Sequence, residues 1–256
     1  MTKSLNATLT EKSAKGPIIF CDFDGTVTQQ DVTDRILEEL ADPSWREVES
    51  AWVGGLIGSR ECLEHQMALV SASARELNQL IDAVPLAPGF EKFYRFTASR
   101  GLPFYILSDG FDYVIRRILR RAGVNGELRN GQHLFTSSMR VKGHRLSVSF
   151  PHAKSTCTHG CATCKAAIIA QVGHGHRPII FIGDGLSDRF AVEVSEVVFA
   201  KKHLLTYCRN KGISCRSFET FSDVESALEA SLFVPPGKPA NTRGLRMRNA
   251  RAASAV

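Results

Sequence analysis

Short apolar runs alternate along the chain with longer segments in which apolar residues recur at helical spacing. The apolar runs cover Ile18–Cys21, Leu102–Leu107, Pro178–Ile182 and Val197–Ala200. The helical segments cover Phe90–Ser99, Tyr113–Leu119, Cys164–Val172 and Asp223–Leu232, the last with Ser222 as its N-cap. Apolar runs without polar alternation are typical of strands buried on both faces, as in a parallel sheet. The order strand, polar loop, helix therefore predicts an α/β fold with a parallel sheet covered by helices. A looser alternation at Val141–Phe150 predicts a hairpin or edge strands.

The segment 31–85 interrupts this order directly after the first strand. Its apolar residues recur at helical spacing, as in Val32 and Ile36, and Pro-Gly sequences mark its end. We therefore expect a small helical domain at 31–85, inserted into a core domain formed by 17–30 and 86–234.

The two ends of the chain are polar and without periodic pattern. We expect 1–16 to be a flexible N-terminus and 235–256 to be a disordered basic tail. The basic residues of the tail are Lys238, Arg243, Arg246, Arg248 and Arg251. They account for all but one of the net positive charges of a chain whose formal charge is +6, so the rest is nearly neutral. Since no aromatic residues are interleaved with them for base stacking, we expect no nucleic acid partner.

Targeting and membrane signals are missing from the sequence. No apolar run approaches the ~20 residues of a membrane span, and no apolar segment near the start resembles a secretory signal. The sequence thus predicts a cytoplasmic protein without a membrane partner, with its 7 cysteines as reduced thiols. A homodimer is left open as its assembly.

Polar motifs follow three of the predicted buried strands. They are Asp22-Phe23-Asp24-Gly25-Thr26, Ser108-Asp109-Gly110 and Gly183-Asp184-Gly185-Leu186-Ser187-Asp188, with Lys165 opening a helix between the last two. The carboxyl ends of parallel strands meet at one edge of a sheet, where ligands bind. Asp22 and Asp24 can point to the same side of their strand, and two carboxylates that close favour a bound cation.

Each of these residue types has a role in phosphoryl transfer. A carboxylate nucleophile divides hydrolysis into two easier displacements. Mg²⁺ takes oxygen ligands and reduces the repulsion between a nucleophile and a phosphate. A hydroxyl, backbone N–H groups and a lysine can hold phosphate oxygens. The motifs together indicate an enzyme that acts on a phosphate ester with Mg²⁺ as cofactor.

In order and spacing, the motifs resemble those of the haloacid dehalogenase superfamily of phosphatases. The resemblance implies that Asp22 is the nucleophile and that Asp24 is a general acid/base whose main-chain carbonyl reaches Mg²⁺. The implied phosphate ligands are Ser108, Asp109, Gly110 and Lys165, and the implied metal ligands are Asp22, Asp24, Asp184 and Asp188, the last directly or in the outer shell. The implied fold is a three-layer Rossmann-like core with a parallel sheet and a small inserted helical cap of the C1 type.

The helical segment resembles the cap of the phosphoserine-phosphatase-like branch of this superfamily, which closes over the substrate. Asp31 stands where that branch has an acid that contacts the substrate. Glu64 stands where the branch has an arginine that reads a carboxylate, with Arg60 four residues earlier. Asp109 replaces the first glycine of the usual Ser-Gly-Gly of motif two. Both departures argue against phosphoserine as substrate, and Asp31, Arg60 and Glu64 are candidate substrate contacts.

A closer resemblance is to the methionine-salvage phosphatases that act on 2-hydroxy-3-keto-5-methylthiopentenyl-1-phosphate. It rests on Phe150-Pro151-His152 with Cys157-x3-Cys161-x2-Cys164-Lys165, on Trp52–Cys62, on Ser108–Asp112, and on Phe199-Ala200 with Leu204–Cys208. It implies hydrolysis of this small ester through an aspartyl-phosphate. The alternatives are a phosphoserine phosphatase-like or other small phosphomonoester hydrolase, a phosphotransferase or mutase, and a non-catalytic protein that binds a phosphate ligand.

The cysteine-rich segment before Lys165 allows two interpretations. Cys157, Cys161 and Cys164, with His152 or His159, could bind structural Zn²⁺ tetrahedrally. Against this, the segment contains one Cys-x2-Cys pair and no second pair. The other interpretation is a set of reduced thiols or a redox-labile loop.

Overall fold

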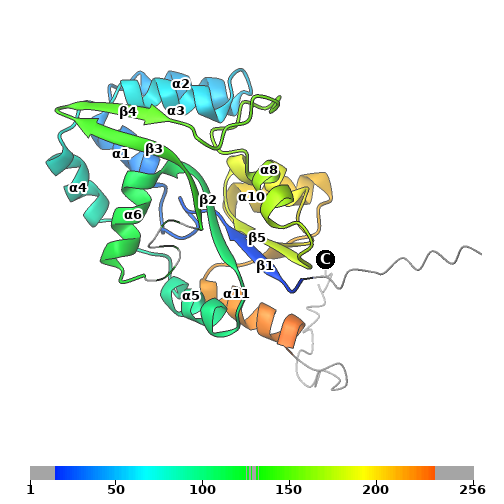
Figure 1. Cartoon of the computed structure of the whole chain (residues 1–256). Coiled ribbons are helices and arrows are strands. Elements are labelled where there is room, and N and C mark those ends of the chain that lie inside the picture. The colour runs from blue at the N-terminus through cyan, green and yellow to red at the C-terminus, as the bar shows by residue number, and fades with distance from the viewer. Residues whose placement is uncertain (1–14, 125, 127, 129–130, 132, 234–256) are drawn as a thin grey trace, which may run out of the picture.

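A sheet of seven strands runs through the computed structural model, which describes residues 15–124, 126, 128, 131 and 133–233 (Figure 1). The strands are β1 (Ile18–Cys21), β2 (Phe104–Phe111), β3 (Leu134–Lys142), β4 (Arg145–Ser149), β5 (Ile179–Gly183), β6 (Val197–Ala200) and β7 (Arg216–Ser217). Their order across the sheet is β4-β3-β2-β1-β5-β6-β7, and all neighbours are parallel except the hairpin β3–β4. Because β1 is central, the motif after it lies in the middle of the carboxyl edge.

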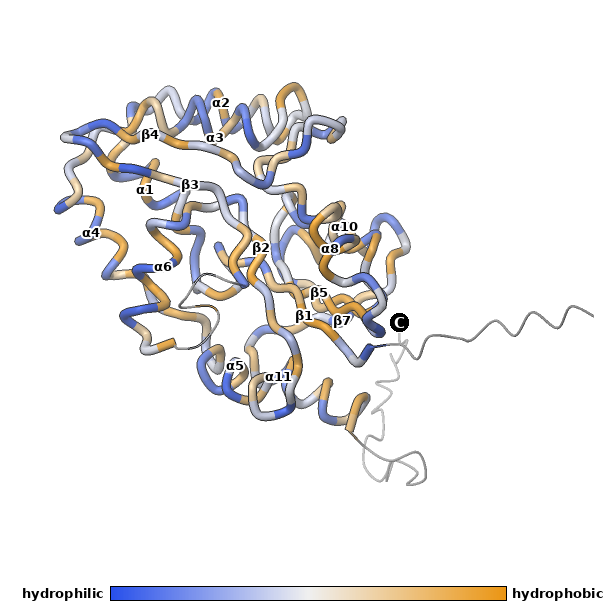
Figure 2. Tube along the Cα trace, in the orientation of Figure 1, coloured by the Kyte–Doolittle hydropathy of each residue, from blue (hydrophilic) through white to orange (hydrophobic). Residues whose placement is uncertain are grey.

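Helices cover both faces of the sheet and make a three-layer α/β fold, as the sequence predicts. One face carries α5 (Phe90–Ser99), α6 (Asp112–Arg121) and α11 (Phe221–Leu228), and the other carries α8 (Lys165–Val172), α9 (Arg189–Val192) and α10 (Lys202–Lys211). Alternation along β1 shows the reason. Ile19 and Cys21 belong to the core on the first face, whereas Ile18 and Phe20 belong to the core on the second. Figure 2 accordingly shows β1 and β5 as mainly hydrophobic.

Four further helices lie between β1 and α5 in the chain. They are α1 (Val32–Leu40), α2 (Trp45–Val53), α3 (Ser59–Ala68) and α4 (Ala74–Asp82). Figure 1 shows α2 and α3 alongside the β3–β4 hairpin, where the Ala72 N–H donates to the carbonyl of His144 at 3.2 Å. On the other side, Arg117 of α6 pairs with Asp82 of α4 at 2.6 Å. The division of the chain into a core and a cap domain stays a prediction.

The structure differs from the sequence-based expectation at two boundaries. β2 continues through Ser108-Asp109-Gly110 to Phe111, with a register shift against β3 between Leu107 and Phe111, so α6 begins without a polar loop. At the C-terminal helix, Ser222 is not the N-cap. Thr220 has this role because Thr220 and Asp223 form a capping box, and α11 therefore starts at Phe221. A short π-helix, η2 (Glu229–Phe233), follows α11.

The expected flexible N-terminus and basic tail fall largely on 1–14 and 234–256, which lie outside the described residues. The first described residue, Lys15, pairs with His176 beside the sheet. Among the helices of the described ranges, none combines the length and the apolar character that crossing a bilayer requires.

Candidate active site

The turn after β1 places two aspartates at the centre of the sheet edge. Asp22 is held by its backbone N–H, which donates to the carbonyl of Ile182 at 2.9 Å, and only 4% of the residue is exposed. The Asp24 carboxylate accepts hydrogen bonds from the Val32 N–H at 3.1 Å and from the Ser108 hydroxyl at 3.4 Å. Asp24 thus links the edge of the core to the start of α1.

The turn after β5 brings two more aspartates to the same place. Asp188 ends the 3₁₀ turn η1 (Leu186–Asp188) and is fully buried. Its carboxylate accepts the backbone N–H groups of Asp184 and Gly185, both at 3.1 Å. The Asp184 carboxylate accepts from the Thr26 hydroxyl at 2.9 Å and pairs with the Lys202 ammonium at 2.9 Å. The two strand-end motifs therefore interlock.

Lys165, the first residue of α8, connects these two turns. Its ammonium lies 2.7 Å from Asp22 Oδ1, 2.6 Å from Asp188 Oδ1 and 3.3 Å from Ser187 Oγ. The side chain is 2% exposed. Burial by itself lowers the pKa of Lys165, but the Asp188 and Asp22 carboxylates raise it well above its usual value, so the group stays an ammonium.

The aspartates form a site that fits a divalent cation. Ligand oxygens of Asp22, Asp184 and Asp188 lie within 4.8 Å of one another. Together with Asp24 these carboxylates outnumber the two ammonium groups that contact them, those of Lys165 and Lys202. Burial, and then the charge of Asp188, raise the pKa of Asp22 well above its usual value, and burial also raises that of Asp188. Hard oxygen donors with an excess of buried negative charge are the donor set that Mg²⁺ prefers.

Motif two adds a hydroxyl and then turns away from the aspartates. The Ser108 hydroxyl accepts the Gly110 N–H at 2.9 Å beside Asp24. The Asp109 side chain instead accepts the Thr163 N–H at 2.9 Å, and the Thr163 hydroxyl donates to the Ser108 carbonyl at 2.8 Å. A phosphate contact from Asp109 would therefore come from its main chain.

The predicted cap residues divide into two groups. Asp31 is the N-cap of α1, accepts the Asp34 N–H at 3.0 Å, and lies close enough to Asp24 to raise the pKa of that carboxyl. Burial raises the pKa of Asp31 itself to about 6. Arg60 and Glu64 are exposed on α3, and within the described part of the chain neither side chain has a hydrogen-bond or ion-pair partner. The structure does not bring these two into the aspartate cluster.

Cys157, Cys161 and Cys164 lie outside the aspartate cluster, in the segment between β4 and α8. All three are partly exposed free thiols. Over the described residues, however, the aspartates alone form a group of three ligands with all atoms within 4.8 Å. The His152 ring packs edge-on against Phe135, with ring centroids 5.1 Å apart.

Sequence reasoning did not single out some residues that hold the site together. Thr26 carried a signal, because it belongs to the motif after β1 and donates to Asp184. Lys202 carried none, because its approach to Asp184 depends on the start of α10, where the φ of Lys202 is +46°. Thr163 stands in the cysteine-rich segment, where its link to Asp109 could not be foreseen.

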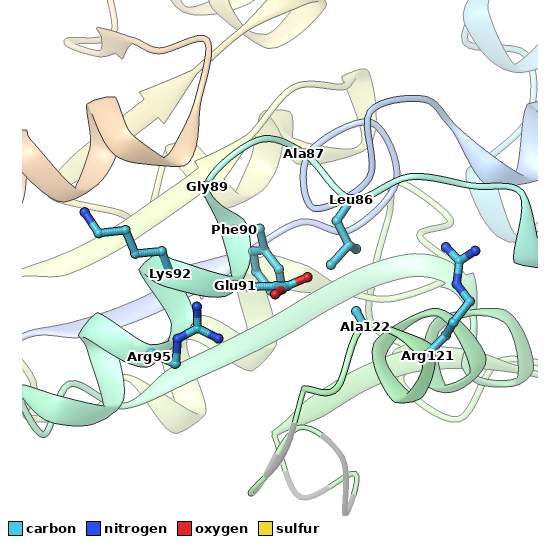
Figure 3. A pocket seen from close by; sticks show the side chains of 9 residues that line it. All are labelled: Leu86, Ala87, Gly89, Phe90, Glu91, Lys92, Arg95, Arg121 and Ala122. Atoms are coloured by element: carbon cyan, nitrogen blue, oxygen red, sulfur yellow. The ribbon is translucent and has the colours of Figure 1, made fainter.

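A cavity of about 640 Å³ lies apart from this site, between α5 and α6 (Figure 3). It is lined by Leu86, Ala87, Gly89, Phe90, Glu91, Lys92, Arg95, Arg121 and Ala122. None of these belongs to the strand-end motifs, and acidic and basic side chains are mixed around it. The cavity gives no reason to move the candidate site from the sheet edge.

Comparisons with known proteins agree with this geometry. A model of the haloacid dehalogenase-like hydrolases matches residues 19–193. A 2-hydroxy-3-keto-5-methylthiopentenyl-1-phosphate phosphatase of Bacillus velezensis is 30% identical over 216 residues, covering 83% of this chain and 90% of that protein. The protein of the same name from Geobacillus kaustophilus is 29% identical over 217 residues, covering 83% and 95%. The structure of a phospho-aspartyl intermediate analogue of phosphoserine phosphatase, 18% identical, superposes with a TM-score of 0.65 over 83% of this chain and 99% of that one, which confirms the fold.

Proposed function

Because the chain belongs to the haloacid dehalogenase-like hydrolases and is a phosphoric monoester hydrolase, we propose that it hydrolyses a small phosphate ester through an aspartyl-phosphate on Asp22. The observation that carries this proposal is the placement of Asp22. Its carboxylate is buried at the centre of the sheet edge, with Lys165 at 2.7 Å and two further aspartates close by. A buried carboxylate beside cations is suited to attack a dianionic phosphate, which it would otherwise repel.

Each residue around Asp22 has a separate role in the proposed reaction. Lys165 and the Ser108 hydroxyl hold phosphate oxygens while an Asp22 oxygen displaces the alcohol. Asp24, on the adjacent turn, gives a proton to the departing oxygen. Burial, and then the charge of Asp31, raise the pKa of Asp24 well above its usual value, which favours the protonated form that an acid needs. In the second step Asp24 takes a proton from the water that hydrolyses the aspartyl-phosphate.

The aspartate cluster would hold Mg²⁺. Asp22, Asp184 and Asp188 offer the ligand oxygens, with the main chain of Asp24 beside them, and Asp188 acts directly or through water. When bound, the ion supplies positive charge that offsets the repulsion between nucleophile and phosphate. The Thr26 hydroxyl donates to one Asp184 oxygen and orients this carboxylate.

The helices of 31–85 act as a cap in this proposal. Asp24 accepts the Val32 N–H at the first residue of α1, so movement of α1 would be transmitted directly to the acid. A cap over the sheet edge excludes water while the ester is cleaved. Asp31, Arg60 and Glu64 are the residues of this segment that we propose as substrate contacts.

For the substrate we propose 2-hydroxy-3-keto-5-methylthiopentenyl-1-phosphate, the ester named in relatives that span 83% of this chain. Phosphoserine has less support. The position expected for a carboxylate-reading arginine carries Glu64, which would repel a carboxylate. In addition, Asp109 stands where the usual motif two has glycine, and its carboxylate accepts the Thr163 N–H.

Structural Zn²⁺ on the cysteines has weaker support than Mg²⁺ on the aspartates. Among the described residues, the three sulfurs do not form a set of ligand atoms that all lie within 4.8 Å of one another, whereas the aspartates do.

The test is phosphate release from a panel of small esters, with and without Mg²⁺, by the wild-type chain and by Asp22→Asn. The panel contains the methylthio ester, phosphoserine and p-nitrophenyl phosphate. We expect selective, metal-dependent turnover of the methylthio ester and at least about 10⁴-fold less in the variant. Activity retained by Asp22→Asn would exclude the aspartyl-phosphate, whereas selective turnover of another ester would exclude only the substrate.

A further inference from the structure

The segment 150–164, which joins β4 to α8 without forming a helix or a strand, touches the helix α3. The Gly160 carbonyl accepts the Arg60 N–H at 3.0 Å, at the start of α3. A Cβ on Gly58 would collide with the Gly160 backbone, so the segment and the start of this helix are closely packed. In the proposed function α3 belongs to a cap that closes over the ester. Movement of α3 would therefore pull on the segment that leads into Lys165.

Thr163 fixes the end of this segment to β2 through two hydrogen bonds, which together form the Thr163 clamp. Its backbone N–H donates to the Asp109 carboxylate at 2.9 Å, and its hydroxyl donates to the Ser108 carbonyl at 2.8 Å. Thr163 is buried, with 2% of the residue exposed. A buried residue of the segment is thus bonded to two consecutive residues of motif two.

The Thr163 clamp connects the two side chains that we propose as phosphate ligands. The Thr163 carbonyl accepts the Lys165 N–H at 2.8 Å, so the backbone of Lys165 follows that of Thr163. On the β2 side of the clamp, the Ser108 hydroxyl accepts the Gly110 N–H at 2.9 Å. The two ligands belong to different elements, α8 and β2, and Thr163 lies between them in contact with both.

Motif two can carry a side chain at position 109 but not at position 110. A Cβ on Gly110 would collide with the Asp24 carboxylate. Successive residues of a strand point to opposite faces, and Asp109 is directed toward Thr163 instead. Glycine, which the usual motif two has at the position of Asp109, has no side chain that could accept the Thr163 N–H. The departure from the usual motif therefore adds one of the two bonds of the clamp.

We propose that Asp109 is a positioning residue that, through Thr163, keeps Lys165 in place while α3 moves. Lys165 then stays in register with Ser108, the other phosphate ligand. This proposal rests on the proposed function, in which these two residues bind phosphate and the cap closes. Because phosphate is common to all candidate esters, loss of the clamp affects every ester alike. A carboxylate that contacted the organic part of the substrate would affect one ester and not another.

The experiment compares Asp109→Ala with Asp109→Asn in the full-length chain, with p-nitrophenyl phosphate and the methylthio ester as substrates. The asparagine oxygen can still accept the Thr163 N–H, whereas alanine leaves this donor without its acceptor. We expect kcat/KM to fall by about 10–10²-fold in Asp109→Ala, equally for both esters, and to change little in Asp109→Asn. The inhibition constant of inorganic phosphate should rise in Asp109→Ala alone. A smaller folded fraction would lower kcat and leave this constant unchanged.

Replacing Thr163 tests the other bond of the clamp. Thr163→Ser keeps the hydroxyl and should keep the rate. Thr163→Val removes the hydroxyl at nearly the same shape and should weaken phosphate inhibition as Asp109→Ala does. When Thr163→Val and Asp109→Ala are combined, the loss should be smaller than the product of the two single losses, because both bonds hold the same residue.

Three kinetic results would overturn the proposal. They are full activity in Asp109→Ala, equal losses in Asp109→Ala and Asp109→Asn, and a loss restricted to the methylthio ester. A second measurement is independent of turnover. Amide hydrogen exchange in the peptide that contains Thr163 and Lys165 should be faster in Asp109→Ala than in Asp109→Asn, and equal exchange would also overturn the proposal. If the wild type cleaved no ester, the proposed function would fail, and the exchange measurement would still decide whether the clamp exists.

Discussion

The sheet edge and the helical segment 31–85 hold their polar side chains in opposite ways. At the edge, Lys165 is 2% exposed and contacts Asp22 and Asp188 at hydrogen-bond distance. On α3, Arg60 and Glu64 are exposed, and no described residue pairs with either side chain. The groups that we propose for the reaction are thus held by their neighbours, whereas these two proposed substrate contacts have no partner among the described residues. This is why the reaction class follows from the geometry more directly than the substrate does.

Replacing Lys165 should give the largest effect and tests whether the edge depends on its buried cation. Lys165→Met leaves two buried carboxylates without their ammonium, and we expect a loss of about 3–5 kcal/mol of unfolding free energy with loss of activity. The measurement is urea denaturation at pH 7. As a control, Arg35→Met removes an i,i+4 ion pair with Glu39 whose carboxylate side chain is 52% exposed, and it should cost less than about 1 kcal/mol. Equal losses would remove the distinction between the edge and the surface.

Replacing Asp24 tests the acid separately from the fold. In Asp24→Asn the amide oxygen can still accept the Val32 N–H, so stability should change little. Turnover of an alkyl phosphate should fall by about 10²–10⁴-fold, because the departing alkoxide needs a proton. With p-nitrophenyl phosphate, whose leaving group is stable as an anion, the first step should fall much less. A parallel loss with both esters in single-turnover assays would contradict the acid role.

Replacing Lys202 tests the affinity of the sheet edge for Mg²⁺. Its ammonium lies 2.9 Å from an Asp184 oxygen and competes with any other cation for this carboxylate. We expect Lys202→Met to bind Mg²⁺ several-fold more tightly, seen as a lower Mg²⁺ concentration for half-maximal thermal stabilisation. Lys211→Met is the matched control, because Lys211 is exposed at the opposite end of α10 from Lys202. Unchanged or weaker binding in Lys202→Met would show that this lysine supports the site instead.

Asp31 stands between the two regions and gives a pH-dependent prediction. Its pKa in the folded chain is about 6 against a usual value of 3.8, so the folded state holds the proton more tightly than the unfolded state. Stability therefore falls as pH rises from about 4 to about 6 and is level above. In metal-free buffer, Asp31→Asn should be more stable than the wild type by at most about 3 kcal/mol at pH 8, with no difference near pH 4. Asp42→Asn should show the opposite sign at pH 8, because hydrogen bonds from Ser44 lower the pKa of Asp42.

The smallest effects are expected on α3. Arg60→Ala and Glu64→Ala should each change the unfolding free energy by less than about 0.5 kcal/mol, because both side chains are exposed and unpaired among the described residues. Their rates with p-nitrophenyl phosphate should be nearly unchanged, and an effect should appear in KM for the proposed methylthio ester. Strong destabilisation by either substitution would show that the side chains on α3 are held as firmly as those at the sheet edge.

The sequence predicted those parts of the molecule that depend on local patterns. β1, β5 and α5 could be predicted from neighbouring residues alone. A strand buried on both faces is an unbroken run of apolar residues, which is visible in the sequence. The polar triplet of motif two was expected in a loop, because three polar or small residues normally end a strand. A register shift against β3 keeps it in β2 instead, and this depends on a partner strand far along the chain.

The candidate site shows the same limit. The proximity of the aspartates at the strand ends could be predicted from the sequence, because all parallel strands end at one edge of the sheet. The contacts of Lys202 with Asp184 and of Asp109 with Thr163 could not be predicted, since each involves a residue of a turn or loop whose conformation has no periodic signal. The family assignment, the phosphatase class and the fold were nevertheless correct.

The close packing of Gly58 against Gly160 restricts how this enzyme can be re-engineered. A Cβ on Gly58 would collide with the Gly160 backbone, and Gly160 has a φ of +62°. Exchanging the helices of 31–85 for those of a relative without glycine at the position of Gly58 would place a side chain against this backbone, unless the segment 150–164 came from the same donor. These two segments are about 65 residues apart in the sequence at their nearest ends, but they have to be exchanged together. We therefore expect chimeras that take both segments from one donor to fold.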